Sequence, residues 1–412
     1  MKKIVLKHVN NSFNYGTAMM AINFIEYLTV NSDEEIEFLL DIKDDINLKR
    51  IESELTVNCK LKKLKYYEKK RKNQSTIFAK IFSKIETFKK YYFDLKELFK
   101  VKTDTIVYLG GDDLSEYYTS SGIILQLLEL YFLSKKKNVF LISQTIGPFS
   151  SWRKTLSKYL LNNCSIYTRD PVSTRYIKNI LKLNKVIESR DLAFLDLPKQ
   201  NIKYHKEVLN KYSIDGKNYI TIIPSGLYSH YTEDFQNYIR CWKNIISKLI
   251  KKTNRPIVLL PHVVKPDVAD DRNIIKQVVN SLDEKEIVKY INKAILPSEA
   301  RAIIGGSYCI ISGRMHPAIS SFQNKVPAIT LSYSIKYKGV IAEGLGFPEL
   351  VIEANNKNKW DNEEIVEKVF DKFIYLEKNY IMIENKIKSK VEEIKKNILL
   401  HIKELSKFLS NN

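Results

Sequence analysis

The sequence predicts an α/β protein with two Rossmann-like domains that face each other across a cleft, followed by a long helix. Three observations support this fold class. Short β-branched runs alternate with longer helical patterns through most of the 412 residues, which is typical of parallel, doubly wound sheets. The alternation starts again near residue 217. Hydrophobic residues make up 44% of the chain, which is enough to form a large core.

The first α/β series defines the predicted N-terminal domain, residues 1–200. Its strands are expected where β-branched and aromatic residues are bounded by polar or turn residues, at 3–9, 36–41, 104–110, 138–143 and 165–170. A turn at 14–16 precedes a predicted helix at 17–29.

The second series defines the predicted C-terminal domain, residues 217–355, after a polar linker at 198–217. Its buried strands are expected at 218–225, 255–262, 308–313 and 326–332. Its helices are expected at 233–252, 269–282 and 298–304. Residues 361–409 then combine helical periodicity with ten lysines and ten acidic residues, which predicts one or more amphipathic closing helices.

Composition limits the compartment and the class of protein. The four cysteines, Cys59, Cys164, Cys241 and Cys309, show no metal-binding or disulfide spacing, so reduced cysteines in the cytoplasm are expected. The N-terminal apolar run is broken by polar residues and does not resemble a signal peptide. The most apolar stretch, 122–133, is too short to span a bilayer. We therefore expect a cytoplasmic protein.

Residues 60–102 form a strongly basic segment, predicted to be an insertion. They contain fifteen Lys or Arg and four Asp or Glu, a net charge of +11 out of +20 for the whole chain. Apolar residues recur there at helical spacing: Ile77, Phe78, Ile81, Phe82, Ile85, Phe88, Tyr92, Leu95 and Leu98. Such a helix either packs on the first domain with a lysine-rich outer face or lies on the anionic inner face of the cell membrane. No nucleic-acid-binding module is recognised, so a nucleic-acid partner is not expected.

Ligands of open α/β sheets bind beyond the carboxyl ends of the strands, so residues at these corners are the candidate site. In the first domain, Gly16 permits a tight turn before a helix. Gly110 and Gly111 allow a ligand to approach the backbone closely. Asp112 then either binds a sugar hydroxyl, acts as a base, or caps a helix. No further ligand is spaced to complete a metal site with it.

Three more strand ends carry candidate residues. Arg169 either faces the cleft or forms an ion pair with Asp170 that stabilises the turn. His262 either meets a ligand or bonds to a neighbouring loop. Ser225 ends the first strand of the second domain and is a further ligand candidate.

The segment "ISGRMHPAISSF" (311–322) places Arg314 and His316 between a strand and a helix. Pro317 suits the first helical position, which predicts His316 as the N-cap. A guanidinium binds carboxylate or phosphate through two hydrogen bonds, and an imidazole transfers protons near neutral pH. Two lysines at the next strand end are further anion ligands, Lys336 and Lys338.

Taken in order, "GGD", "SQTIGP", "TRDPVS", "DLAFL", "SGRMH" and "YSIKYKG" resemble the motifs of the polysaccharide pyruvyltransferase family, over about residues 1–350. The resemblance implies a glycosyltransferase-B-like fold, with the acceptor on the N-terminal domain and phosphoenolpyruvate on the C-terminal domain. It implies transfer of pyruvate from phosphoenolpyruvate to two hydroxyls of a cell-surface saccharide, giving a cyclic ketal. The acceptor would be a saccharide, often lipid-linked, and no cofactor or metal is required.

The same resemblance assigns roles to residues of this chain. Arg314 of the Arg-x-His motif would hold phosphoenolpyruvate, and His316 would be the general acid. Arg169 and Lys336 would bind the substrate anions, and Asp112 is a candidate base. The family's first loop commonly reads Asn-x-Gly-Asp, whereas Thr17 stands in the Asp place here, so an acceptor role of that loop is in doubt.

Two other functions remain open at this point. A nucleotide-sugar-dependent glycosyltransferase of the same architecture would use the Arg-x-His corner for a diphosphate. A saccharide- or membrane-binding scaffold would keep the fold without turnover.

Overall fold

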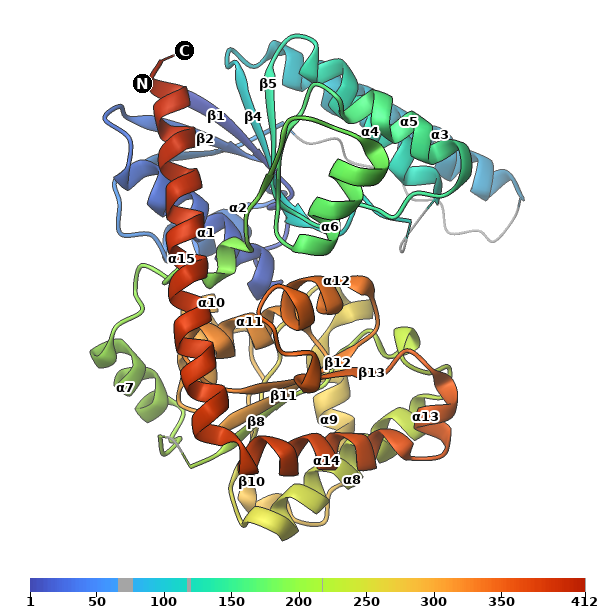
Figure 1. Cartoon of the computed structure of the whole chain (residues 1–412), viewed down its shortest axis with the longest axis vertical. Helices are drawn as coiled ribbons and strands as arrows, with labels where there is room; N and C mark the ends of the chain where they lie inside the picture. The colour runs from blue at the N-terminus through green and yellow to red at the C-terminus, as the bar shows by residue number, and fades with distance from the viewer. Residues whose placement is uncertain (66–76, 117–119, 217, 412) are drawn as a thin grey trace.

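The computed structural model describes residues 1–65, 77–116, 120–216 and 218–411. It confirms the predicted fold class. Two fully parallel sheets stand one above the other, each flanked by helices, and a long helix runs along both (Figure 1).

The first sheet has seven strands in the order β3-β2-β1-β4-β5-β6-β7. Their bounds are β1 Lys2–Lys7, β2 Ile36–Leu40, β3 Lys60–Lys63, β4 Thr105–Gly111, β5 Asn138–Gln144, β6 Ser165–Thr168 and β7 Val186–Glu188. Every residue of β4 up to Gly110 is buried, as expected of a central strand covered on both faces.

The second sheet has six strands in the order β10-β9-β8-β11-β12-β13. Their bounds are β8 Ile220–Ile223, β9 Ile257–Leu259, β10 Val288–Tyr290, β11 Cys309–Ser312, β12 Ala328–Ser332 and β13 Val351–Glu353. In both sheets the strand order reverses beside the first strand, at β1/β4 and at β8/β11. The carboxyl ends of these strands are where doubly wound sheets bind ligands.

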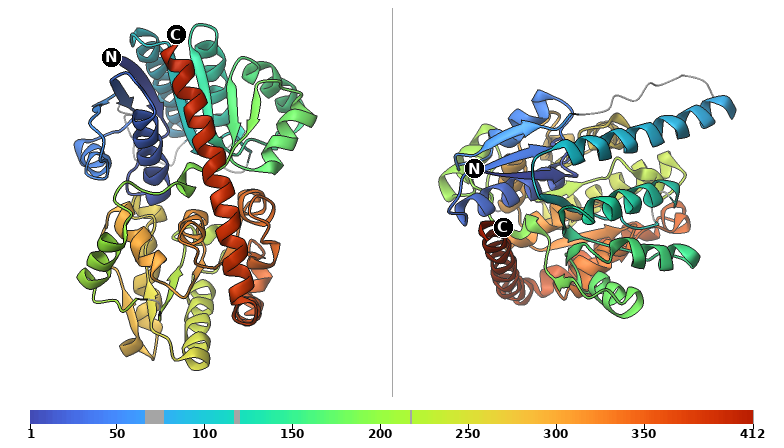
Figure 2. Two further views of the ribbon diagram at one scale, coloured as in Figure 1. Left: turned by 60° about the vertical axis from the view of Figure 1, so that its left-hand side comes forward. Right: turned by 90° about the horizontal axis from the view of Figure 1, so that it is seen from above.

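Helices cover both faces of the first sheet. On one side lie α3 Ile77–Lys100, α4 Ser120–Ser134 and α5 Ser151–Leu161, side by side when the molecule is seen from above (Figure 2). The other side carries α1 Tyr15–Val30, which is buried on nearly all sides because it packs between the sheet and other helices. Further helices of this half are α2 Asp45–Glu52 and α6 Pro171–Arg175.

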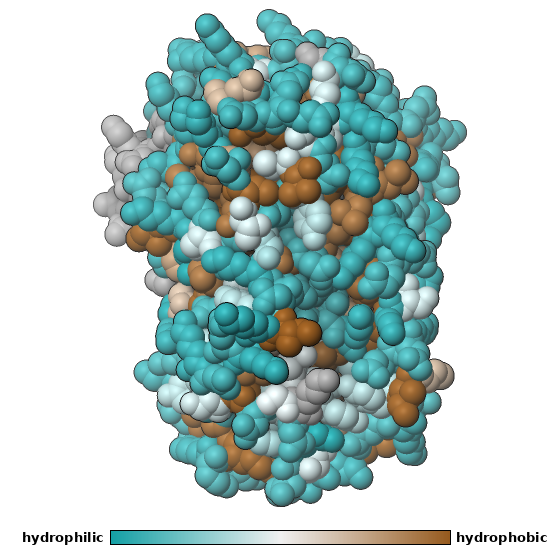
Figure 3. All heavy atoms as spheres, turned by 90° about the vertical axis from the view of Figure 1, so that its left-hand side faces the viewer, coloured by the Kyte–Doolittle hydropathy of each residue, from teal (hydrophilic) through white to brown (hydrophobic). Residues whose placement is uncertain are grey.

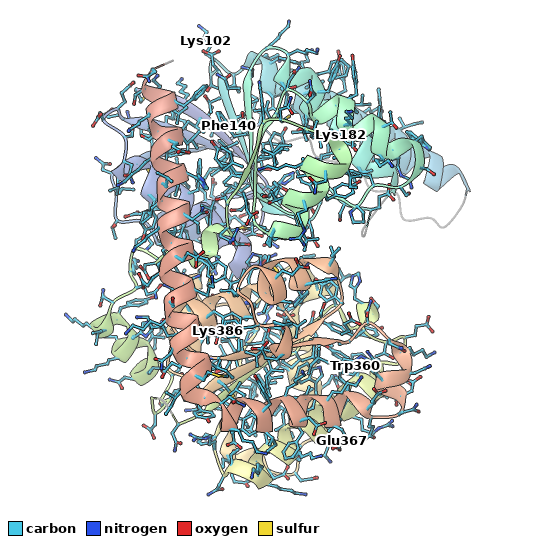
Figure 4. All side chains as sticks on the ribbon, viewed as in Figure 1. Lys102, Phe140, Lys182, Trp360, Glu367 and Lys386 are labelled. Atoms are coloured by element: carbon cyan, nitrogen blue, oxygen red, sulfur yellow. The ribbon has the colours of Figure 1, made fainter. Side chains whose placement is uncertain are left out.

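The second sheet is flanked by helices. They are α8 Phe235–Thr253, α9 Asp271–Ser281, α10 Pro297–Gly305, α11 Met315–Gln323, α12 Ile335–Tyr337 and α13 Lys357–Asp361. Of these, α8, α9 and α10 match the predicted helices within two residues. The aromatic side chains of Tyr231, Tyr238 and Trp360 pack together in this half. Trp360, which is labelled in Figure 4, is fully buried.

The C-terminal segment forms two helices, α14 Glu364–Lys378 and α15 Tyr380–Ser410, which meet at Asn379. Helix α14 packs on α8, and α15 crosses from the second half to the first (Figure 1). Lys386 on α15 lies 4.4 Å from the ring of Phe347 in the second half, and Phe408 contacts Phe140 in the first sheet. Lys386 and Phe140 are labelled in Figure 4. Helix α15 therefore joins the two halves along their length.

The prediction missed several short elements. Residues 60–63, assigned to an insertion, form the edge strand β3. This strand was not predicted because its side chains are mostly exposed and lack the alternation of buried and exposed residues that indicates a strand. Strands β7, β10 and β13 have three residues each, too few for a periodic pattern. The predicted linker contains helix α7 Ile202–Lys211.

The surface toward which α7 projects is mainly hydrophilic, with apolar side chains in separate groups (Figure 3). All four cysteines are free. Among the described residues, no helix has both the length and the apolar character needed to cross a membrane.

Candidate active site

A cavity of about 560 Å³ lies between the two sheets, at the carboxyl ends of their strands. Residues from both halves line it, which matches the predicted cleft. Among the predicted candidates, these residues line the cavity: Gly110, Gly111, Asp112, Arg169, His262, Arg314, His316 and Lys336.

The corner that carries Arg314 is built by β11 and α11. Helix α11 begins at Met315, and Arg314 is its N-cap with extended backbone. The prediction that His316 is the N-cap and Pro317 the first helical residue was therefore wrong by two residues. Proline is tolerated at Pro317 because this third position still belongs to the first turn, whose N–H groups have no partner within the helix.

The side chain of Arg314 is held by a buried carboxylate. Its Nε and Nη2 lie 3.1 and 2.7 Å from Oδ1 of Asp271, and Nη2 also donates to the carbonyl of Ala269 at 2.8 Å. Burial by itself lowers the pKa of Arg314, but Asp271 outweighs burial and raises it. Nη1 makes no hydrogen bond to the described residues, which leaves one edge of a permanently charged guanidinium for a ligand.

Asp271 is itself fixed by three backbone amides. Its carboxylate accepts hydrogen bonds from the N–H groups of Gly226, His262 and Val263, at 2.7 to 2.9 Å. These amides come from the loops after β8 and β9. Arg314 is thus positioned by a carboxylate that several loops hold in place.

His316 lies one helical residue beyond Met315 and faces the first half of the chain. Its Nε2 is 3.6 Å from Oδ2 of Asp191, longer than a hydrogen bond. The same oxygen is 3.1 Å from Nη1 of Arg169. Burial raises the pKa of Asp191, but His316, Arg169 and the N–H of Ala193 outweigh burial and lower it to about 2. Asp191 therefore stays ionised and links an arginine to the imidazole.

Arg169 does not pair with Asp170, which was the structural alternative. Its Nε donates to the hydroxyl of Thr145 at 2.8 Å, and its ion pair is with Asp191. Asp170 instead caps α6 by accepting from the N–H of Ser173. Arg169 is 1% exposed and still lines the cavity.

Asp112 and Lys336 form an ion pair across the cavity, with Nζ and Oδ2 3.2 Å apart. Lys336 also donates to the hydroxyl of Tyr333 at 3.0 Å. Asp112 comes from the loop after β4 and Lys336 from α12, so this pair joins the two halves. Asp112, the predicted base, and Lys336, a predicted anion ligand, are therefore paired with each other.

The first loop, residues 10–18, docks on the second half. Asn14 pairs with Val263 in an antiparallel bridge, the N–H of Tyr15 donates to the carbonyl of His262, and the hydroxyl of Tyr15 accepts from Ile295. Gly16 then lies against His316: a Cβ at Gly16 would be 2.2 Å from Cγ of that ring. The loop acts on the position of His316, whereas the sequence suggested a ligand contact for Gly16.

His262 is 1% exposed, and its ring packs edge-on against Tyr15 with the centroids 5.4 Å apart. Burial, followed by the charges of His316, Arg314 and Arg301, lowers the pKa of His262 well below its usual value. Its Nε2 has no hydrogen-bond partner among the described residues. A neutral imidazole with an unpartnered nitrogen at the cavity is suited to a hydrogen bond with a ligand.

A profile described as polysaccharide pyruvyl transferase matches residues 14–335. The chain belongs to this family. The Amylovoran biosynthesis protein AmsJ of Erwinia amylovora is 22% identical over 263 residues, 61% of this chain and 62% of that protein. The chain thus matches about three fifths of the length of this curated relative.

Solved structures share the fold at low sequence identity. UDP-GlcNAc 2-epimerase from Neisseria meningitidis, bound to UDP-GlcNAc, superposes with a TM-score of 0.64 at 14% identity, covering 99% of this chain and 100% of that chain. A glycosyltransferase from Rickettsia africae gives a TM-score of 0.56 at 12% identity, covering 100% and 99%. This likeness shows the fold alone, and the fold is glycosyltransferase-B-like.

Two predicted candidates of this family member lie away from the cavity. Ser225 is fully buried, and its hydroxyl and N–H bond to Leu227 and Tyr238 behind the corner. Lys338 is exposed and does not line the cavity. Neither residue is brought to Arg314 and His316.

Sequence reasoning missed Asp191 and Asp271 as site residues. Asp191 was visible as the first residue of the quoted "DLAFL" motif, but the three-residue strand before it was not recognised. Asp271 opens α9 after another aspartate, which resembles an ordinary helix start. In the described residues, no group of three or more His, Cys, Asp or Glu side chains is arranged to hold a metal ion.

Proposed function

We propose that this protein transfers pyruvate from phosphoenolpyruvate to two hydroxyls of a saccharide, forming a cyclic ketal in the synthesis of a cell-surface polysaccharide. The observation that carries the proposal is the convergence of Arg314, His316, Arg169 and Lys336 on one cavity. Phosphoenolpyruvate carries a carboxylate and a phosphate, so it requires several cations at once. Family membership supports the same reaction.

In the proposed mechanism, Arg314 binds one anionic group of phosphoenolpyruvate through its free edge, and Lys336 binds the other. Arg169 also lines the cavity and adds a third cationic group there, beside its partner Asp191. His316 is the proposed general acid: it lines the same cavity, and its Nε2 is 3.6 Å from the carboxylate of Asp191.

The reaction begins when protonated His316 gives its proton to the methylene carbon of phosphoenolpyruvate. C2 then becomes electrophilic, and an acceptor hydroxyl forms a bond to it while losing its proton. The C2–O bond to phosphate breaks, and a second hydroxyl closes the ketal. One hydroxyl proton restores His316, and the other leaves with phosphate or through a base.

Asp112 is the proposed base for a hydroxyl, and its pairing with Lys336 refines that role. The carboxylate oxygens of Asp112 can accept hydrogen bonds from hydroxyl groups, which suits binding of the acceptor as well as proton transfer. The phosphate of the donor would draw Lys336 toward itself and so change the position of Asp112 relative to the acceptor. The pair would thus couple donor binding to acceptor binding.

The test incubates the purified protein with phosphoenolpyruvate and a panel of saccharides, and measures released phosphate and a ketal mass gain. A matched pair of variants is His316→Gln and His205→Gln. His205 lies on α7, away from the cavity. We expect His316→Gln to lose at least about 100-fold in turnover while it still binds phosphoenolpyruvate, and His205→Gln to keep turnover. Consumption of a nucleotide-sugar without phosphate release from phosphoenolpyruvate would replace this proposal with the glycosyltransferase alternative.

A further inference from the structure

Helices α3, α4 and α5 form one layer whose outer surface is both aromatic and basic. We propose that this surface, called here the α3–α5 face, docks on an anionic lipid bilayer. The inner side of the same layer lines the cavity through Lys90, Tyr91 and Gln126. Docking would therefore bring the cavity close to the bilayer surface.

The first observation is the orientation of α3. Among its described side chains, three are buried, and two of these are acidic: Glu86 and Asp94 are 3% and 8% exposed, whereas the third is Leu98. Those turned outward include Ile85, Phe88 and Tyr92, which are 47%, 62% and 63% exposed. A helix that buried its whole apolar side would show mainly lysines to water, whereas this helix leaves large apolar and aromatic side chains exposed. Leu98 alone of the predicted stripe is well buried, and the side chains at 77–84 lie outside the described part.

The second observation is that the neighbouring helices continue the aromatic surface. Eight aromatic side chains are exposed in the described residues, and six belong to these three helices: Phe88, Tyr92, Phe99, Phe132, Trp152 and Tyr159. The other two are Tyr290 and Phe408. Seen from above, the three helices lie side by side along one side of the sheet (Figure 2).

Contacts between the helices make this surface continuous. The hydroxyls of Tyr131 on α4 and Tyr159 on α5 are 3.1 Å apart. Lys136, just after α4, lies 5.7 Å from the ring of Phe99 on α3. Aromatic rings with polar ends are the side chains that bilayer interfaces accommodate best.

The third observation is charge. Within the three helices, five lysines are exposed and no acidic side chain is exposed among the described residues. The lysines are Lys89, Lys96, Lys100, Lys154 and Lys158, and the exposed Lys135 and Lys136 follow α4 directly. The acids of the same helices, Glu86, Asp94, Glu97 and Glu129, are buried or, for Glu97, 13% exposed. A basic surface with interleaved aromatic groups complements anionic headgroups, since each lysine near such a membrane adds to binding.

A further consequence rests on the proposed function. If the acceptor saccharide is carried on a lipid, docking through the α3–α5 face holds the cavity beside the membrane that contains it. The saccharide would then enter past α3 and α4 without leaving the membrane surface.

The test is co-sedimentation of the full chain with vesicles of phosphatidylcholine alone or mixed with phosphatidylglycerol. We expect binding only to the mixed vesicles, weakened by salt because exposed charges are screened. The double variant Phe88→Ser/Tyr92→Ser should lose about tenfold or more in partitioning. Lys96→Glu/Lys154→Glu should lose a similar factor. The matched control, Ile381→Ser/Met382→Ser on α15, removes equally exposed apolar groups and should bind like the parent chain.

Three results would overturn the inference. The first is that the parent chain does not sediment with the mixed vesicles. The second is that the Phe88/Tyr92 variant sediments with them as well as the parent chain does. The third is that sedimentation velocity shows a self-association of the parent chain that the Phe88/Tyr92 variant has lost. Phosphate release with a water-soluble acceptor should be unchanged in the Phe88/Tyr92 variant. Membrane docking and pyruvate transfer are thus measured by separate assays, so a negative result for docking does not count against the proposed reaction, and the reverse also holds.

Discussion

Substitution of Gly16 by alanine tests whether the first loop positions the proposed acid. In the structure a Cβ at Gly16 would lie 2.2 Å from Cγ and 2.3 Å from Nδ1 of His316. Ordinary contact between such atoms needs about 3.5 Å, so the ring or the helix has to move by about 1.3 Å.

The backbone at Gly16 has little freedom to make that movement. The preceding Tyr15 is fully buried, its N–H is bonded to His262 and its hydroxyl to Ile295. The imidazole therefore moves, and its 3.6 Å separation from Asp191 changes. A displacement of about 1 Å costs on the order of 100-fold in turnover.

The assay is steady-state phosphate release with phosphoenolpyruvate varied, together with urea unfolding. We expect kcat to fall about 100-fold, whereas KM for phosphoenolpyruvate changes little because Arg314 and Lys336 are untouched. Alanine favours the helix by about 0.5–1 kcal/mol, which partly offsets an overpacking cost of about 1–3 kcal/mol. The variant should therefore fold.

The control is Gly216→Ala, where the nearest atom to a new Cβ is 3.6 Å away. This variant should retain the turnover of the parent chain. A folded Gly16→Ala protein with turnover within about twofold of the parent would refute the positioning of His316 by this loop.

Two further predictions concern the charged pairs. Asp191→Asn leaves the buried guanidinium of Arg169 without its carboxylate and should lower the free energy of unfolding by about 3–5 kcal/mol, measured in urea at neutral pH. Because the pKa of Asp191 is about 2 in the folded chain and about 3.9 when unfolded, its ionisation stabilises the fold above about pH 4. That contribution is lost as pH falls toward 2, so the parent and the variant should converge in acid; a constant difference would contradict the assignment. Lys336→Met should raise KM for phosphoenolpyruvate by about 10- to 100-fold, as expected for loss of a charged hydrogen bond, whereas Lys338→Met, outside the cavity, should not. Equal effects of the two lysine variants would remove Lys336 from the donor site.

Much of the site was predictable because parallel sheets impose a simple rule. Every strand of a parallel sheet ends at the same edge, so polar residues after buried strands meet there. This rule brought Gly110, Asp112, Arg169 and Arg314 to one cavity, as observed. The start of helix α11 was predicted wrongly at Pro317, because proline is tolerated at every position of the first helical turn and so does not mark the first residue.

The rule does not say which side chains contact each other. Ser225 and Lys338 also follow strands. However, the hydroxyl of Ser225 accepts a hydrogen bond from the N–H of Leu227, and Lys338 is exposed to solvent. Such outcomes depend on side-chain packing within a few ångströms, which periodicity does not encode.

By itself the sequence determined the fold class, the family resemblance and the Arg314–His316 corner, because these follow from local periodicity and from motifs a few residues long. Only the tertiary structure decided the partners: Asp271 for Arg314, Asp191 for His316, and Asp112 for Lys336. These pairs join residues between 43 and 224 positions apart. Their contacts arise from the approach of two sheets and the burial of charges between them, where a carboxylate must meet a cation to remain ionised.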